Sequence, residues 1–221
     1  MASTISAREW QSPIWLIAAI MLGMLAGCGP SKVVVDGDFP APTISKLPIS
    51  IGVWYDPAFE NHEMYDEAAS KTESSWLVTT GQAQVEMWDI MLQGMFADVV
   101  PMVGAPGTDQ LNPKVDAVLI PEVLELQYAI PSHTNVKVYE IWIRYRFKLV
   151  TITGDPIAEW TMPAYGKTPT AFLQTDQAAV NLAAVMALRD AGANFASTFT
   201  RVPAVQNWLE QQLGNDQGAG E

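Results

Sequence analysis

The stretch that decides the fold is residues 139–151, Tyr-Glu-Ile-Trp-Ile-Arg-Tyr-Arg-Phe-Lys-Leu-Val-Thr. Apolar or aromatic side chains occupy every second position from Tyr139 to Leu149. The positions between them include four charged residues: Glu140, Arg144, Arg146 and Lys148. Such alternation is typical of a β-strand with one buried face and one solvated face, and that arrangement is characteristic of antiparallel sheets.

The neighbouring sequence extends this strand into a larger fold. A Thr-Gly-Asp-Pro turn at residues 153–156 follows it, and a long apolar alternation with Glu122 as its one break precedes it. Further signals predict strands over residues 48–55, 97–103, 118–128 and 157–162, and helices over residues 81–96, over residues 176–200 and from Pro203 onward. We therefore expect an α+β fold with an antiparallel sheet, in the order strand, helix, strand, meander, helix. The helices should pack on one face of that sheet, and the alanine-rich helix 176–200 is thin enough to lie close to it.

Composition limits the class of protein. The chain has 221 residues, of which 49% are hydrophobic and 16% charged, which fits one folded domain with short extensions. Its formal net charge of −12 argues against a nucleic-acid partner, because phosphate binding needs a basic surface. A single cysteine excludes both a disulfide framework and a cysteine-based zinc site.

The amino terminus has the pattern of a secretion signal. Residues 11–27 contain no charged side chain, and their apolar core of roughly a dozen residues matches a signal-peptide core. Spanning a bilayer as a helix takes about twenty residues, so this core is too short. It ends in Leu25-Ala26-Gly27-Cys28, which contains the only cysteine.

This tetrapeptide resembles the lipobox of bacterial lipoproteins at every position. The resemblance implies that residues 1–27 are a signal peptide, that Cys28 carries lipid on its thiol and usually a palmitate-type acyl group on its new amine, and that the protein is anchored in a membrane. Gly29 stands where an aspartate often retains such proteins at the inner membrane, so the resemblance favours the outer membrane, with the protein facing the periplasm. The alternatives are an uncleaved hydrophobic anchor or an ordinary signal followed by a free thiol.

The mature chain divides into three parts. Residues 28–47 are rich in Gly, Pro and Ser and predict the lipidated cysteine followed by a flexible tether, which at full extension would reach roughly 60 Å. Residues 48–213 predict a single periplasmic α+β domain. Residues 214–221 predict a polar, disordered tail.

Motifs for enzymatic chemistry are incomplete. Gly166-Lys167-Thr168 has the end of a phosphate-binding loop, but Thr161 stands where the first glycine belongs. His62 begins a zinc-protease pattern in which Asp66 replaces the second histidine. The acidic neighbours of His62 could form a weak hard-cation site or simply a solvated loop. His133 falls in a turn.

Acidic pairs do not supply the missing chemistry either. Strand parity places Glu122 and Glu125 on opposite faces, so they should not act as a carboxylate pair. We therefore predict no catalytic residue, no metal site and no cofactor, and a protein that is not an enzyme.

The solvated side of strand 139–151 is the most suggestive surface. It gathers Arg144, Arg146 and Lys148, with Trp142 adjoining, and these four residues form a possible partner-binding site. The alternative is that the three cations pair with acids on neighbouring strands. Two tryptophans that the patterns do not assign to the core, Trp76 and Trp142, could anchor an interface.

The order of elements over residues 48–213 resembles that of small accessory lipoproteins of envelope transport or assembly systems. These include lipoproteins that accompany ABC-type lipid transporters and activators of cell-wall synthases. The resemblance implies a non-enzymatic subunit that binds an envelope protein. Two alternatives are a carrier of lipid or another small hydrophobic ligand, with a cavity between helix 82–96 and the meander, and a hydrolase that depends on His62 or His133.

Overall fold

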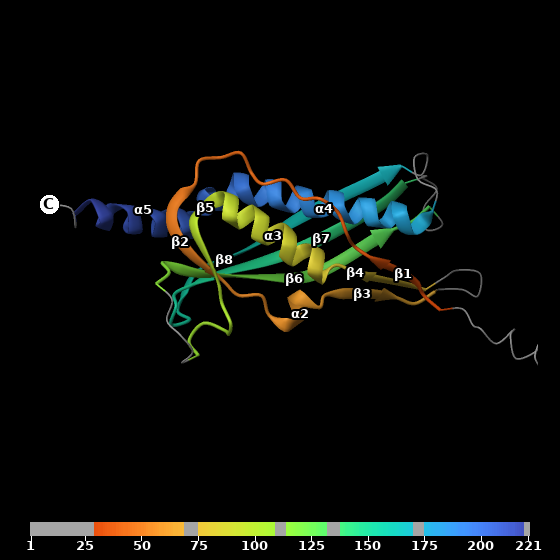
Figure 1. Ribbon diagram of the computed structural model, residues 1–221, viewed down its shortest axis with the longest axis horizontal. Coiled ribbons are helices and arrows are strands. Elements are labelled where there is room, and N and C mark those ends of the chain that lie inside the picture. The colour runs from red at the N-terminus through yellow and green to blue at the C-terminus, as the bar shows by residue number, and fades with distance from the viewer. Residues whose placement is uncertain (1–28, 69–74, 109–113, 132–137, 170–174, 219–221) are drawn as a thin grey trace, which may run out of the picture.

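The elements come from a computed structural model that describes residues 29–68, 75–108, 114–131, 138–169 and 175–218 (Figure 1). Cys28 and His133 lie outside these ranges. The strands are β1 (Ser31–Val34), β2 (Leu47–Val53), β3 (Glu63–Asp66), β4 (Trp76–Thr79), β5 (Phe96–Pro101), β6 (Ala117–Ala129), β7 (Val138–Val150) and β8 (Pro156–Pro169). The helices are α2 (Pro57–Glu60), α3 (Gly81–Met95), α4 (Asp176–Thr198) and α5 (Pro203–Gly218), with a 3-10 turn at Phe199–Arg201.

The main sheet has five strands in the order β5-β2-β6-β7-β8. Strands β6, β7 and β8 form the expected antiparallel meander. Strand β2 instead pairs in parallel with both β5 and β6. Its parallel pairing with β5 is possible because the chain returns through α3 between the two strands. The prediction of an α+β fold is confirmed, and the sheet itself is mixed rather than purely antiparallel.

The buried face of the sheet is the one that the alternation in β7 predicts. Ile141, Tyr145, Phe147 and Leu149 are at most 1% exposed, and α3 and α4 cover this face (Figure 1). Trp88 of α3 lies at the centre, with its ring centroid 5.1 Å from that of Phe147 and 5.6 Å from that of Tyr145. Burying each such side chain contributes about 1.5–3 kcal/mol, so this aromatic cluster joins the helices to the sheet.

Helix α4 lies close against β8, as its alanines predict. Its first turn is capped by Thr175, whose hydroxyl accepts a hydrogen bond from the Ala178 N–H at 3.1 Å. At the contact with the sheet, a Cβ atom on Gly166 would lie only 2.1 Å from the Ala183 carbonyl oxygen and 2.3 Å from the Ala187 nitrogen. Gly166 therefore serves helix packing on a strand, and not a phosphate-binding loop.

A second, three-stranded sheet has the order β1-β4-β3, and no pattern in the sequence indicated it. Strand β1 pairs in parallel with β4, and the Ser31 N–H donates to the Ser75 carbonyl at 2.7 Å. Trp76, at the start of β4, is only 4% exposed. The expectation that Trp76 anchors an interface was therefore wrong, because its ring packs beside Tyr128 inside the domain.

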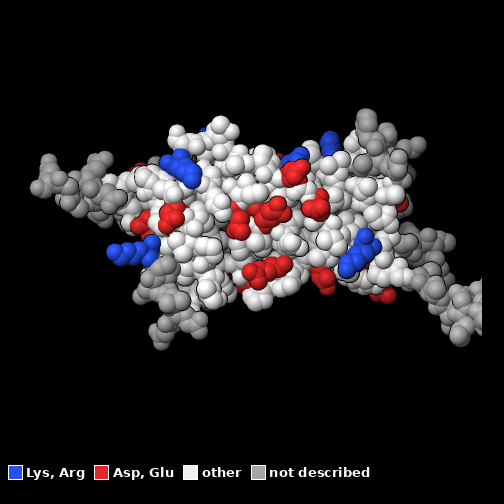
Figure 2. Space-filling model, in the orientation of Figure 1, with Lys and Arg blue, Asp and Glu red and all other residues white. Residues whose placement is uncertain are grey.

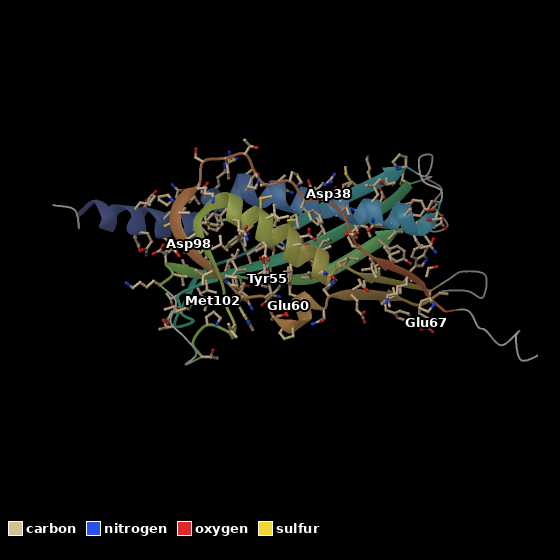
Figure 3. The ribbon with its side chains drawn as sticks, in the orientation of Figure 1. Asp38, Tyr55, Glu60, Glu67, Asp98 and Met102 are labelled. Atoms are coloured by element: carbon tan, nitrogen blue, oxygen red, sulfur yellow. The ribbon has the colours of Figure 1, made fainter. Side chains whose placement is uncertain are left out.

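The segment before β2 also differs from the prediction of a flexible tether over residues 28–47. Val33 and Val35 are each 4% exposed, and Phe39 is 8% exposed. The Asp38 carbonyl accepts a hydrogen bond from Nη2 of Arg189 on α4 at 2.7 Å, and this part of the chain crosses the helices (Figures 1 and 3). Residues 31–39 are thus part of the domain, because their apolar side chains find a core to join.

Helix α5 begins at Pro203, as expected, and buries Trp208. It continues to Gly218, so the predicted tail over residues 214–221 starts inside a helix, and its last three residues lie outside the described ranges. Among the helices of the described ranges, none has both the length and the apolar character needed to cross a bilayer.

Candidate functional site

The surface of interest is the outer face of the sheet, meaning the side of β6, β7 and β8 opposite to α3 and α4. Trp142, Arg144, Arg146 and Lys148 all project from this face of β7, as their parity predicts. Because strands β6 and β8 flank β7, side chains from three strands meet here.

The three cations are paired with acids on the neighbouring strands. Nη2 of Arg144 lies 2.8 Å from Oε2 of Glu125. Nε of Arg146 lies 3.4 Å from Oε2 of Glu122, whose other oxygen accepts from Nζ of Lys148. These contacts are partly solvated, and such pairs each contribute about 0–1 kcal/mol. The outer face is thus close to electrically neutral, which matches the alternative of cross-strand pairing.

A β-bulge places both acids on this face. Strand β6 pairs with β7 as Glu122 with Arg146 and as Glu125 with Arg144, and the register shifts between them. The extra residue, Leu124, reverses the parity of the rest of β6. The prediction that Glu122 and Glu125 lie on opposite faces was therefore wrong. Both carboxylates are held by cations, so this pair has no free acid or base.

Beside the ion pairs, the aromatic ring of Trp142 borders a shallow groove. Trp142 is 39% exposed, and its ring centroid lies 5.2 Å from that of Tyr165 on β8. The Tyr165 hydroxyl donates to the Glu140 carboxylate at 2.6 Å, which raises the pKa of Tyr165 to about 12 and keeps the hydroxyl protonated. The groove, here called the Trp142 groove, encloses about 230 Å³ between Trp142, Arg144, Glu125, Gln127 and Pro163.

His62 belongs to a separate polar chain that enters the core. Its Nδ1 lies 2.7 Å from the Thr80 hydroxyl, Gln84 donates to that hydroxyl at 2.9 Å, and Tyr145 donates to Gln84 at 2.7 Å. Because Gln84 uses its amide N–H toward Thr80, the Thr80 hydrogen is free to donate to His62. The other acceptor within reach of Thr80, the His62 carbonyl, lies at 3.5 Å. This chain favours a neutral imidazole with its proton on Nε2.

The acidic residues near His62 do not assemble a cation site. Asp56 caps α2, where its carboxylate accepts from the Phe59 N–H at 2.7 Å. In the described ranges, no group of three or more His, Cys, Asp or Glu side chains is close enough to hold a metal ion. The polar chain from His62 to Tyr145 joins the loop after α2 to the sheet through its hydrogen bonds.

This network predicts a pH-dependent stability. Burial lowers the pKa of His62, against the smaller opposite effect of Glu63, so the unfolded chain takes up this proton at a higher pH than the folded protein does. The unfolding free energy should be fully retained above the unfolded pKa of about 6.5 and should fall as pH drops toward the folded value. Chemical denaturation at a series of pH values between about 5 and about 7.5 measures this slope.

Two substitutions separate His62 from other groups in that titration. His62→Gln keeps a side chain able to bond Thr80 but does not titrate, so the fall should disappear. His133→Gln, at the one other histidine, should retain it. Burial raises the pKa of Asp89, so this carboxyl makes the unfolding free energy rise as pH falls, opposite to the effect of His62. That contribution should persist in both variants. An unchanged fall in His62→Gln would contradict the assignment.

The place that the lipid-carrier hypothesis gives to a cavity is filled by side chains. The space between α3 and the meander is filled by Trp88, Tyr145 and Phe147, all 0% exposed. A cavity of about 170 Å³ does lie between α3, α4 and residues 39–42. It is smaller than the roughly 300–1,000 Å³ typical of small-molecule sites.

Three residues that line the Trp142 groove, Glu125, Gln127 and Pro163, were not predicted from the sequence, nor was Tyr165, whose ring packs beside Trp142. Their recognition needs the pairing of β7 with its neighbours, such as Trp142 opposite Tyr165. For Pro163 and Tyr165 on β8, the turn at residues 153–156 carries that signal, because a hairpin turn sets the register of the two strands that it joins. Glu125 and Gln127 lie on β6, whose register this turn does not set.

Comparison with known proteins shows similarity in fold. No family model matches the chain, and no curated protein matches it. Protein XCC0632 from Xanthomonas campestris, which carries the family designation DUF330, is 13% identical over 80% of this chain and 97% of its own, with a TM-score of 0.51. A Helicobacter pylori protein described as a neuraminyllactose-binding hemagglutinin homolog is 10% identical over 81% of this chain and 100% of its own, with a TM-score of 0.50. At these identities the likeness concerns the fold alone, and fold does not determine function.

Proposed function

We propose that the protein is a lipoprotein anchored through Cys28 in the outer membrane, with a periplasmic domain that binds another envelope protein and catalyses no reaction. The lipobox Leu25-Ala26-Gly27-Cys28 supports the anchor. Similar architecture in XCC0632 supports a small independent α+β domain. The role is that of an accessory subunit of an envelope transport or assembly system.

The observation that carries the binding role is the exposed Trp142 beside a polar rim. Large aromatic side chains with an apolar body are frequent anchors of protein interfaces. Around it, Arg144 and Glu125 are paired but remain 56% and 40% exposed at their side chains, so a partner can exchange contacts with them. Because the rim is neutral as a whole, the partner surface needs no strong charge.

Site-specific photo-crosslinking in a Gram-negative host tests the binding role. A photoreactive amino acid at Gln127, on the rim of the Trp142 groove, should give an adduct with a discrete envelope protein. The same amino acid at Leu182, exposed on α4 at the opposite side, is the matched control and should not give it. Adding Trp142→Ala to the Gln127 probe should abolish the adduct while leaving the melting temperature nearly unchanged, because Trp142 lies outside the core.

Two results would contradict the binding role. One is the absence of any protein adduct at Gln127 in correctly lipidated protein. The other is an identical set of adducts from Gln127 and Leu182, which would indicate unspecific proximity. If Trp142→Ala loses the adduct but also unfolds, the milder Trp142→Tyr takes its place. That variant keeps an aromatic ring and should retain part of the crosslink.

A further inference from the structure

The chain between the predicted lipid site and the folded domain is very short. Strand β1 begins at Ser31, and only Gly29 and Pro30, both exposed, separate it from Cys28. Ser31 is fixed by its N–H bond to the Ser75 carbonyl and by pairing with Trp76. A residue spans at most about 3.6 Å, so Ser31 lies within roughly 11 Å of the Cys28 Cα atom.

The start of β1 marks one end of the elongated domain. Ser31 and Asp66 both pair with Trp76, and the Tyr128 hydroxyl donates to Asp66 at 2.7 Å, which places the end of β6 beside them. Val138 pairs with Pro169, so β7 begins and β8 ends on the same side. Figure 1 shows these termini together at the end opposite α5, and in Figure 3 Glu67 lies at this end and Asp98 and Met102 toward the other.

We propose that the protein stands on the lipid bilayer by this anchored end, defined by Ser31, Asp66, Trp76, Val138 and Pro169, with α5 pointing away from the membrane. The proposal rests on the lipidation of Cys28 in the proposed function. The anchored end contacts the headgroup layer of the same membrane into which the lipid on Cys28 is inserted. The charge distribution disfavours a domain lying flat on the side that carries α3 and α4, because Asp and Glu outnumber Lys and Arg there (Figure 2) and anionic headgroups repel such a surface.

This orientation places the Trp142 groove near the membrane. Trp142 is the fifth residue of β7, counted from the anchored end at Val138, which corresponds to about 13 Å along the strand. Adding the link before β1, the groove lies within about 25 Å of the lipid surface. The far end of β8, fourteen residues long, lies about 43 Å from its anchored end. The binding partner is therefore a protein at the surface of the same membrane, and not one reached through a long tether.

Depth-dependent quenching on the lipidated full chain tests the orientation. Cys28 is the only cysteine and its thiol would carry lipid, so an introduced cysteine is the only free thiol. A fluorophore is attached at Lys167→Cys, exposed near the anchored end of β8, or at Val103→Cys, which is 87% exposed after β5. The labelled proteins are reconstituted into phosphatidylethanolamine–phosphatidylglycerol vesicles that contain headgroup-nitroxide lipid. We expect at least threefold stronger quenching at position 167 than at position 103.

A spacer variant provides the control. Inserting twenty Gly and Ser residues between Pro30 and Ser31 adds a coil of about 25 Å, so quenching at position 167 should fall to the level seen at position 103. Equal quenching at the two positions without the spacer, in protein whose Cys28 is shown by mass spectrometry to carry lipid, would overturn the orientation alone. Absence of lipid on Cys28 would overturn the proposed anchor and the orientation together.

Discussion

Gly166→Ala is expected to destabilise the domain by about 3 kcal/mol, although it adds only one methyl group. The new Cβ would meet the Ala183 carbonyl oxygen at 2.1 Å and the Ala187 nitrogen at 2.3 Å, and both atoms belong to the backbone of α4. Backbone cannot rotate away as a side chain can, so the whole helix would have to move off β8. The helix is also held through its own Phe195, whose ring packs against Trp88 of α3 in the aromatic cluster, and this contact opposes the movement. Equilibrium unfolding in urea measures the loss.

Gly214→Ala is the matched control for the same chemical change. A Cβ at Gly214 has no atom within 4 Å, and the residue lies in α5, where alanine is the better helix former. We expect that variant to be neutral or slightly more stable. A loss below about 0.5 kcal/mol in Gly166→Ala would show that α4 is free to shift on the sheet.

The long elements of the fold were predictable because their sequence patterns record burial directly. Strand β7 alternates without interruption, and its predicted inner residues are buried. Helix α4 has both a capping threonine and a small-residue face, and both features act as predicted. In these elements, local preference and tertiary packing agree, so the sequence alone is informative.

The short strands were not predictable for the complementary reason. Strands β1, β3 and β4 have four residues each, too few for alternation to be distinguished from a loop. These strands are stabilised by pairing with strands that are distant in the chain, as β1 pairs with β4. The flexible-tether prediction failed on the same ground, since residues 31–39 are held by β4 and α4 and not by any preference of their own.

The candidate site was predicted in part. Parity placed Trp142, Arg144, Arg146 and Lys148 on one face, and the structure agrees. Parity failed for Glu125, because a single bulge residue reverses every later side chain in β6 and composition gives no sign of it. The polar rim of the groove therefore required the three-dimensional register.

The second large effect is expected at Gln84, the buried centre of the polar chain. Gln84→Met should lower the unfolding free energy by about 2–4 kcal/mol, because it leaves the Tyr145 hydroxyl, 0% exposed, without its acceptor and removes the donor to Thr80. Urea unfolding, with far-ultraviolet circular dichroism to establish that the folded state persists, measures this change.

A double-mutant cycle distinguishes lost hydrogen bonding from lost packing. Tyr145→Phe alone should cost about 1–3 kcal/mol, since it leaves the Gln84 carbonyl oxygen buried without a donor. With Gln84→Met already present, that oxygen is gone, so Tyr145→Phe should cost little more. The double variant should then be more stable than the sum of the single losses predicts, by about 1–2 kcal/mol. Additivity within about 0.3 kcal/mol would mean that Gln84 and Tyr145 contribute to stability independently, and would contradict the hydrogen bond between them as the source of the loss.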